Sequence, residues 1–164
     1  MTQKRMMPRV LLVLYAGLML WLLFFQSARI PDYSAAYWLQ VKSNLNLVPM
    51  RTVGNYLHIL MNRDYYLDKW GFASMYTYQA QQAVINLGGN IGMFIPLGFL
   101  LPWVFEKLRK WWKVLLVTAV IITLVEIAQL FSLLGSCDID DLILNVLGAA
   151  IGYAIWYLLL IRKN

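Results

Sequence analysis

A carboxylic acid within an apolar run is the first residue of this sequence that could carry chemistry. Glu126 lies in the largely apolar residues 112–134, and Gln129 follows it on the same helix face. A carboxylate at that depth costs roughly 2.5–3.5 kcal/mol, so it should face other protein groups or a water-filled cavity. We interpret the pair as part of a functional site. The structural alternative is a hydrogen bond between helices.

A second polar group opens the next apolar run, and it consists of Asp138, Asp140, Asp141 and Asn145. The spacing of Asp138, Asp141 and Asn145 aligns them along one helix face. One aspartate at a helix start is explained by capping and by the helix dipole. Three aspartates exceed what a cap needs, so we expect this stripe to face the helix bundle.

A third polar group lies near the start of another apolar run. Asn86 and Asn90 are four residues apart, and glycines that favour close helix packing surround them: Gly88, Gly89 and Gly92. Pro96 should kink this helix and free a carbonyl. Asn86 and Asn90 are expected to lie level with Asp141 and Asn145. The sequence therefore predicts that three membrane spans contribute polar groups to one layer.

The chemistry of this layer is open between several classes. Carboxylates with Asn and Gln suit a hard divalent cation such as Mg²⁺ or Ca²⁺, general acid–base catalysis, or hydrogen bonding to a sugar or phosphate headgroup. The single histidine, His58, is interpreted as an interfacial residue. Cys137 stands beside three aspartates, which should raise its pKa and disfavour a thiolate nucleophile. No catalytic triad, zinc spacing or phosphate-binding loop is present.

Composition places these residues in a membrane protein. Of the 164 residues, 61% are hydrophobic and only 13% are charged, and the mean hydropathy is +0.61. A soluble domain this small could not bury so much apolar surface. The net charge of +6 comes from basic residues that stand mostly between the apolar runs, which favours anionic lipid headgroups over nucleic acid.

Four runs are long enough to cross a bilayer, at about residues 10–26, 84–105, 112–134 and 139–161. We therefore predict an all-α, polytopic membrane helix bundle that forms a single domain over residues 1–164. The first run is interpreted as a retained signal anchor rather than a cleaved signal peptide. Residues 27–83 form an aromatic-rich outer segment along the headgroup region, with short helices at about 35–41 and 53–61.

The distribution of lysine and arginine predicts the orientation. Basic residues precede the first run, fill the connection between the second and third runs, and follow the last run: Lys4, Arg5, Arg9, Lys107, Arg109, Lys110, Lys113, Arg162 and Lys163. The connection between the third and fourth runs has none. The positive-inside rule places both termini in the cytoplasm and the polar layer near the outer face.

Four motifs resemble those of the VanZ-like family. Residues 46–50 (Asn-Leu-Val-Pro-Met) resemble the family's Asn-Leu-hydrophobic-Pro-Phe signature, and residues 86–102 resemble its Asn-x-x-x-Phe-x-Pro-x-Gly core. Residues 126–129 match its Glu-x-x-Gln, and residues 138–148 match its Asp-Ile-Asp-Asp…Asn-x-x-Gly. Two departures are Met50 in place of Phe, and the lack of an Arg shortly before the Asp-rich motif. Arg51 is considered as its substitute.

The resemblance implies a protein of the bacterial cytoplasmic membrane whose named relative is associated with resistance to the glycopeptide teicoplanin. The first hypothesis is a protein that binds or shields an outer-face lipid, a lipid-linked cell-wall precursor or a lipophilic glycopeptide. Its expected ligand-binding residues are Asn46, Arg51, Asn86, Asn90, Gln129 and Asn145.

Two further hypotheses remain open. The first is an intramembrane hydrolase or transferase, whose catalytic residues would be Glu126, Asp138, Asp140 and Asp141, the aspartates holding a metal. The second is a small transporter. Gly148 and Gly152 form a Gly-x-x-x-Gly pair through which we expect a homodimer.

Overall fold

Four long helices dominate the computed structural model, which describes residues 3–25, 33 and 36–161. They are α1 (Gln3–Phe24), α5 (Ala73–Val104), α6 (Trp111–Ser132) and α7 (Ile139–Trp156), the last continued by the π-helical segment Tyr157–Ile161. Each contains a stretch long and apolar enough to cross a membrane. The prediction of an all-α, four-span membrane protein is confirmed.

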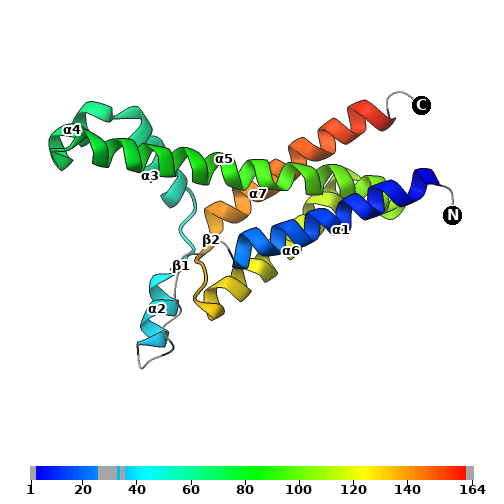
Figure 1. Cartoon of the computed structure of the whole chain (residues 1–164), viewed down its shortest axis with the longest axis horizontal. Coiled ribbons are helices and arrows are strands. Elements are labelled where there is room, and N and C mark those ends of the chain that lie inside the picture. The colour runs from blue at the N-terminus through cyan, green and yellow to red at the C-terminus, as the bar shows by residue number, and fades with distance from the viewer. Residues whose placement is uncertain (1–2, 26–32, 34–35, 162–164) are drawn as a thin grey trace.

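Helix α5 is longer than the sequence predicted. It begins at Ala73 rather than near residue 84, and it continues through Pro96 and Pro102 to Val104. At 1.5 Å per residue its 32 residues extend about 48 Å, which exceeds a hydrocarbon core of about 30 Å. The N-terminal part of α5 therefore projects beyond the other three long helices (Figure 1).

The outer segment folds into short helices: α2 (Tyr37–Ser43), α3 (Arg51–Met61) and α4 (Arg63–Trp70). Two of them lie close to the predicted positions. In Figure 1, α3 and α4 lie beside the projecting part of α5, whereas α2 extends separately past the end of α6. The segment is therefore not a single layer along the membrane surface. Its expected beginning, residues 27–32, lies outside the described residues.

Helices α5 and α7 cross with their backbones in close contact. A Cβ added at Gly148 or Gly152 would lie within 3.0 Å of the carbonyl oxygen of Ile91 or Ile95, and a Cβ at Gly98 would meet the backbone of Ala149. This contact corrects the expected homodimer interface, because α5 of the same chain already covers both glycines of α7. Three glycines of α5 that were expected to pack instead face open space: Gly88, Gly89 and Gly92.

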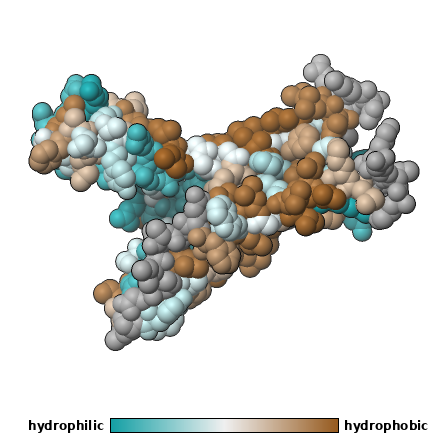
Figure 2. Space-filling model, viewed as in Figure 1, coloured by the Kyte–Doolittle hydropathy of each residue, from teal (hydrophilic) through white to brown (hydrophobic). Residues whose placement is uncertain are grey.

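The apolar core joins α1, α5 and α6. Its buried side chains are Met19, Phe94, Leu97, Leu101, Val114 and Ile122. Many other apolar side chains of the long helices stay exposed, among them Val13 at 71% and Leu124 at 62%. Figure 2 shows this hydrophobic surface over the long helices, and hydrophilic surface gathers over α3 and α4. An apolar surface of this extent is expected to face lipid.

Both ends of the described chain lie at one end of the molecule, opposite α3 and α4 (Figure 1). An even number of crossings requires this arrangement. Arg162 and Lys163, which contributed to the predicted orientation, lie outside the described residues. The assignment of the two sides to cytoplasm and exterior stays a prediction.

Gly148→Ala tests the contact between α5 and α7. Because the neighbouring atoms belong to the α5 backbone, the added methyl group should force the helices apart and destabilise the protein by about 3 kcal/mol. Gly92→Ala is the matched control: nothing lies near it, so it should leave stability unchanged or raise it by about 0.5–1 kcal/mol. Thermal unfolding in detergent measures both. Equal melting temperatures would contradict the packing.

Candidate functional site

A two-residue parallel β bridge joins the outer segment to the start of α7. Strand β1 (Leu45–Asn46) pairs with β2 (Cys137–Asp138), with Leu45 opposite Cys137 and Asn46 opposite Asp138. The Cys137 N–H also donates to the Asn44 carbonyl at 2.9 Å. Two of the sequence motifs, residues 46–50 and 138–148, therefore lie side by side.

Asp140 binds the start of α3 and does not face a ligand site. Its Oδ1 accepts from the Met50 N–H at 2.5 Å, and its Oδ2 accepts from the Thr52 and Val53 N–H groups at 2.8 and 3.0 Å. Met50 adopts a left-handed conformation with φ 62°, which turns the chain into α3. The Asp140 side chain is 0% exposed and supplies the N-terminal cap that α3 lacks locally.

Asp138 makes a second set of contacts in the same place. Both its oxygens lie 3.1 Å from Asn46 Nδ2, and Oδ2 accepts from the Thr52 hydroxyl at 2.5 Å. Its Oδ1 accepts from the Asp140 N–H at 2.9 Å and caps α7. Sequence reasoning missed Thr52. Its only signal was a hydroxyl residue directly before the helix predicted at about 53–61, the position where such groups often cap.

Glu126 connects α6 to the junction between the outer segment and α7, which consists of Asn46, Thr52, Asp138 and Asp140. The residue is 7% exposed, and Oε2 accepts from the Asp138 N–H at 2.7 Å. Burial raises the pKa of the neighbouring Cys137 thiol, and the charge and hydrogen bond of Glu126 and the charge of Asp138 raise it further. The predicted rise is confirmed. Cys137 is therefore a poor nucleophile near neutral pH.

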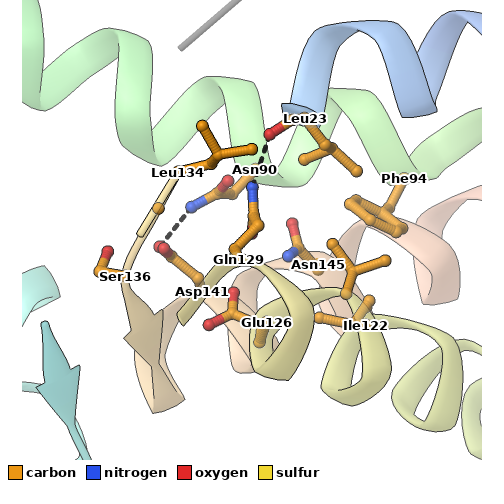
Figure 3. A pocket seen from close by; sticks show the side chains of 12 residues that line it. Leu23, Asn90, Phe94, Ile122, Glu126, Gln129, Leu134, Ser136, Asp141 and Asn145 are labelled. Atoms are coloured by element: carbon orange, nitrogen blue, oxygen red, sulfur yellow. Dashed lines mark hydrogen bonds between the residues drawn. The ribbon is translucent and has the colours of Figure 1, made fainter. Parts of the chain in front are cut away.

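A polar cavity of about 200 Å³ lies on the other side of Glu126 (Figure 3). Apart from Ser136, its polar side chains come from three long helices: Asn90 of α5, Glu126 and Gln129 of α6, and Asp141 and Asn145 of α7. Leu23, Phe94, Ile122, Val125, Leu134, Gly135 and Ser136 complete the wall. We call this cavity the polar pocket. Of the three aspartates, only Asp141 lines it.

Some of the polar groups in the pocket hold one another. Asn90 Nδ2 donates to Asp141 Oδ1, and Gln129 Nε2 donates to the Leu23 carbonyl at 2.8 Å, near the end of α1 (Figure 3). Asn145 differs from these. It is 5% exposed, and its Oδ1 has no hydrogen-bond partner although its amide points toward the space beside Asp141 and Glu126. The pocket therefore presents a buried, unsatisfied acceptor.

Several expected site residues lie elsewhere. Asn86 is exposed and donates to the Gln82 carbonyl within its own helix, and Arg51 is exposed in the first turn of α3. Asn46 belongs to the junction with Asp138. His58 is exposed and contacts the Tyr66 hydroxyl through Nδ1.

The three aspartates do not form the shared metal site that the enzyme hypothesis assumed. Asp138 and Asp140 direct their oxygens to donors of the outer segment, whereas Asp141 faces Asn90. Within the part of the chain that the structure describes, no three acidic, cysteine or histidine side chains come together as metal ligands. Among the described residues, only Glu126 and Asp141 place carboxyl groups in the polar pocket.

Four membrane-length helices around a buried polar pocket define a multi-pass membrane protein with a small ligand-sized site. The family model described as VanZ/LLP1 matches residues 12–160, and the chain belongs to this family. It is thus a VanZ-like membrane protein, of a type associated with antibiotic resistance. Comparison with curated proteins and with solved structures gave no match.

Asp140→Asn tests the cap that holds α3. The amide keeps one acceptor oxygen but turns its NH₂ group toward backbone N–H donors. We therefore expect the free energy of unfolding to fall by about 2–4 kcal/mol. Thermal unfolding and limited proteolysis of residues 45–61 would measure this loss. Asp64→Asn, at an exposed position in the first turn of α4, should change stability by less than about 0.5 kcal/mol. Protease resistance equal to wild type would contradict the cap.

Maleimide labelling tests the environment of Cys137, the single cysteine of the chain. A raised pKa means less thiolate at any given pH, so the reaction should be slow at pH 7 and its pH profile displaced upward. Glu126→Gln removes a charge that raises this pKa and should speed the reaction. The reference thiol is Met61→Cys in a Cys137→Ser background, because Met61 is 79% exposed. If Cys137 and the reference thiol reacted with the same pH profile, the raised pKa of Cys137 would be contradicted.

Proposed function

We propose that the polar pocket binds the headgroup of a cell-envelope lipid or of a lipophilic glycopeptide, and that this binding contributes to teicoplanin-type resistance. The observation that carries the proposal is the partnerless Oδ1 of Asn145 beside Glu126 and Asp141. A buried acceptor without a partner costs about 1–3 kcal/mol. A ligand that donates a hydrogen bond to it removes this cost, whereas an apolar residue would suit the fold alone better.

The proposed location is the outer leaflet of the bacterial cytoplasmic membrane. The connection between α5 and α6 carries Lys107, Arg109 and Lys110, and it lies at the opposite end of α6 from Glu126 and Gln129. Under the positive-inside rule this connection is cytoplasmic, so the pocket opens toward the outer half of the bilayer. Lipid-linked cell-wall precursors and glycopeptides are both present on that side.

Aromatic residues of the outer segment support a ligand that carries sugars. The hydroxyl groups of Tyr33 and Tyr37 donate to the carbonyls of Ser132 and Phe131 at 3.1 and 2.9 Å, which holds these rings over the end of α6. Trp38 packs edge-on against Tyr37 and is 64% exposed. Exposed rings fixed in this way can stack on sugar faces at the membrane surface.

An intramembrane hydrolase or transferase is the second candidate, because Glu126 and Asp141 place two carboxyl groups in one pocket. Such a pair suits general acid–base chemistry on a lipid headgroup. One contact weakens the case for an enzyme: Glu126 Oε2 already accepts the Asp138 N–H, which leaves only the other oxygen for proton transfer. Asp138 and Asp140 have no part in the reaction under this geometry.

Asn145→Leu is the decisive substitution for the binding proposal. Losing the acceptor should reduce teicoplanin resistance in a susceptible Gram-positive host to that of cells without the protein. Stability should stay the same or rise by about 1 kcal/mol, because an unsatisfied buried group is removed. Asn86→Leu makes the same chemical change at an exposed position outside the pocket and should keep full resistance. Inhibitory concentrations at matched membrane abundance measure both.

Glu126→Gln and Asp141→Asn separate binding from catalysis in the same assay. Under binding alone, each variant should lose only part of the resistance, because the amide that replaces the carboxyl group still accepts hydrogen bonds. Full loss of resistance with normal folding would favour the enzyme. No resistance from the wild-type protein would refute the teicoplanin role, and equal loss in Asn86→Leu would refute the role of the pocket.

A further inference from the structure

An apolar cavity of about 330 Å³ adjoins the polar pocket and shares three wall residues with it: Leu23, Phe94 and Val125. It lies between α1, α5 and α6 and is lined almost wholly by apolar side chains. On α1 its lining runs from Leu12 to Leu23, about 16 Å along the helix axis. A polar compartment and a longer apolar one therefore lie side by side and share part of their wall.

The apolar cavity reaches the lipid-facing surface of the bundle. Ala16 and Leu20 both line it, and both remain exposed on α1, Leu20 at 55%. A hydrocarbon chain could therefore enter sideways from the bilayer without crossing water. Phe94 is 3% exposed and lines both cavities, so a ligand that occupies both would pass along its ring.

The charges of the polar pocket restrict the headgroup. Among the residues that the structure describes, the pocket is lined by two carboxyl groups and by Asn145, whose Oδ1 has no hydrogen-bond partner, and by no lysine, arginine or histidine. These acceptors favour a cation that also donates hydrogen bonds, because hydrogen bonds between charged partners are the strongest. Within this described lining, a phosphate group would meet two carboxyl groups and no basic side chain, which is unfavourable.

We propose that the site takes an amphiphile with a primary ammonium headgroup, which binds Asp141, Glu126 and Asn145, and one hydrocarbon chain, which fills the apolar cavity. This inference rests on the proposed function and narrows its ligand to one chemical class. An aminolipid of the membrane and an amine-bearing lipophilic antibiotic both present this chemistry.

Photolabelling with a dodecylammonium ion that carries a diazirine near its chain end tests both halves of the proposal. In phosphatidylcholine nanodiscs, we expect adducts on the cavity residues of α1, α5 and α6. Ala16→Phe narrows the cavity at an exposed position and should lower labelling several-fold, whereas Val13→Phe, which is exposed and outside the cavity, should not. Adducts spread evenly over the lipid-facing surface would overturn the assignment of the chain.

Competition with unlabelled amphiphiles of equal chain length tests the headgroup. Dodecylammonium should compete at concentrations about tenfold lower than dodecyltrimethylammonium, which has the charge but no N–H donors, and dodecyl phosphate should compete worst. Asn145→Leu and Asp141→Asn should reduce the preference, and Asn86→Leu should retain it. Equal competition by the two cations would overturn the ammonium assignment.

Two further comparisons are needed. One identifies the source of the ammonium group, and the other distinguishes the ammonium proposal from the broader proposal that the pocket binds a headgroup. Lysophosphatidylethanolamine competing better than teicoplanin would assign the site to a membrane aminolipid, and the reverse order would assign it to the antibiotic. If dodecyl phosphate competed best and Asn145→Leu abolished that competition, the ammonium class would be wrong but headgroup binding would stand. Competition that no pocket variant alters would refute both.

Discussion

The rest of the structure around α3 and the start of α7 depends on one interaction, between the Asp140 carboxylate and three backbone N–H groups. The contact is fully buried and joins the first turn of α7 to the start of α3. Because α3 is held there, residues 45–46 can pair with residues 137–138, and Asn46 and Thr52 reach Asp138. Asp138 in turn offers its N–H to Glu126. The position of Glu126 thus depends, through Asp138, on the contact between Asp140 and the start of α3.

Four acidic residues, Glu126, Asp138, Asp140 and Asp141, form two pairs with different roles. Asp138 and Asp140 face donors that saturate their oxygens, which is the condition under which buried carboxylates stabilise a fold. Asp141 and Glu126 face the polar pocket, where Asn145 has an acceptor without a partner. A protein selected for stability alone would satisfy or remove that acceptor. The arrangement therefore separates a stabilising junction from a site with unused hydrogen-bonding capacity.

The close crossing of α5 and α7 explains where the pocket can lie. Gly98, Gly148 and Gly152 let the two backbones approach with no side chain between them. On one side of this crossing, α6 brings Glu126 to the first turns of α7, and α1 closes the wall through Leu23. The apolar cavity continues along α1 from that point. The polar pocket therefore lies beside the crossing, among α5, α6 and α7, and the apolar cavity lies next to it among α1, α5 and α6.

The sequence by itself determined the four apolar helices, the family and the polar groups on three spans, because composition and helical period are local properties. It predicted the direction of the Cys137 pKa shift from the adjacent aspartates, but burial and Glu126, which tertiary structure brings to the thiol, are its larger causes. Tertiary structure decided which partner each polar group meets. Helical spacing placed Asp138 and Asp141 on one face, yet Asp138 turned to Asn46 and Asp141 to Asn90. Spacing also could not show that Gly148 packs on α5 of its own chain, since a close helix contact looks the same whether the partner is internal or external. Contacts between residues about fifty to ninety positions apart depend on how the helices pack, and no local pattern encodes that.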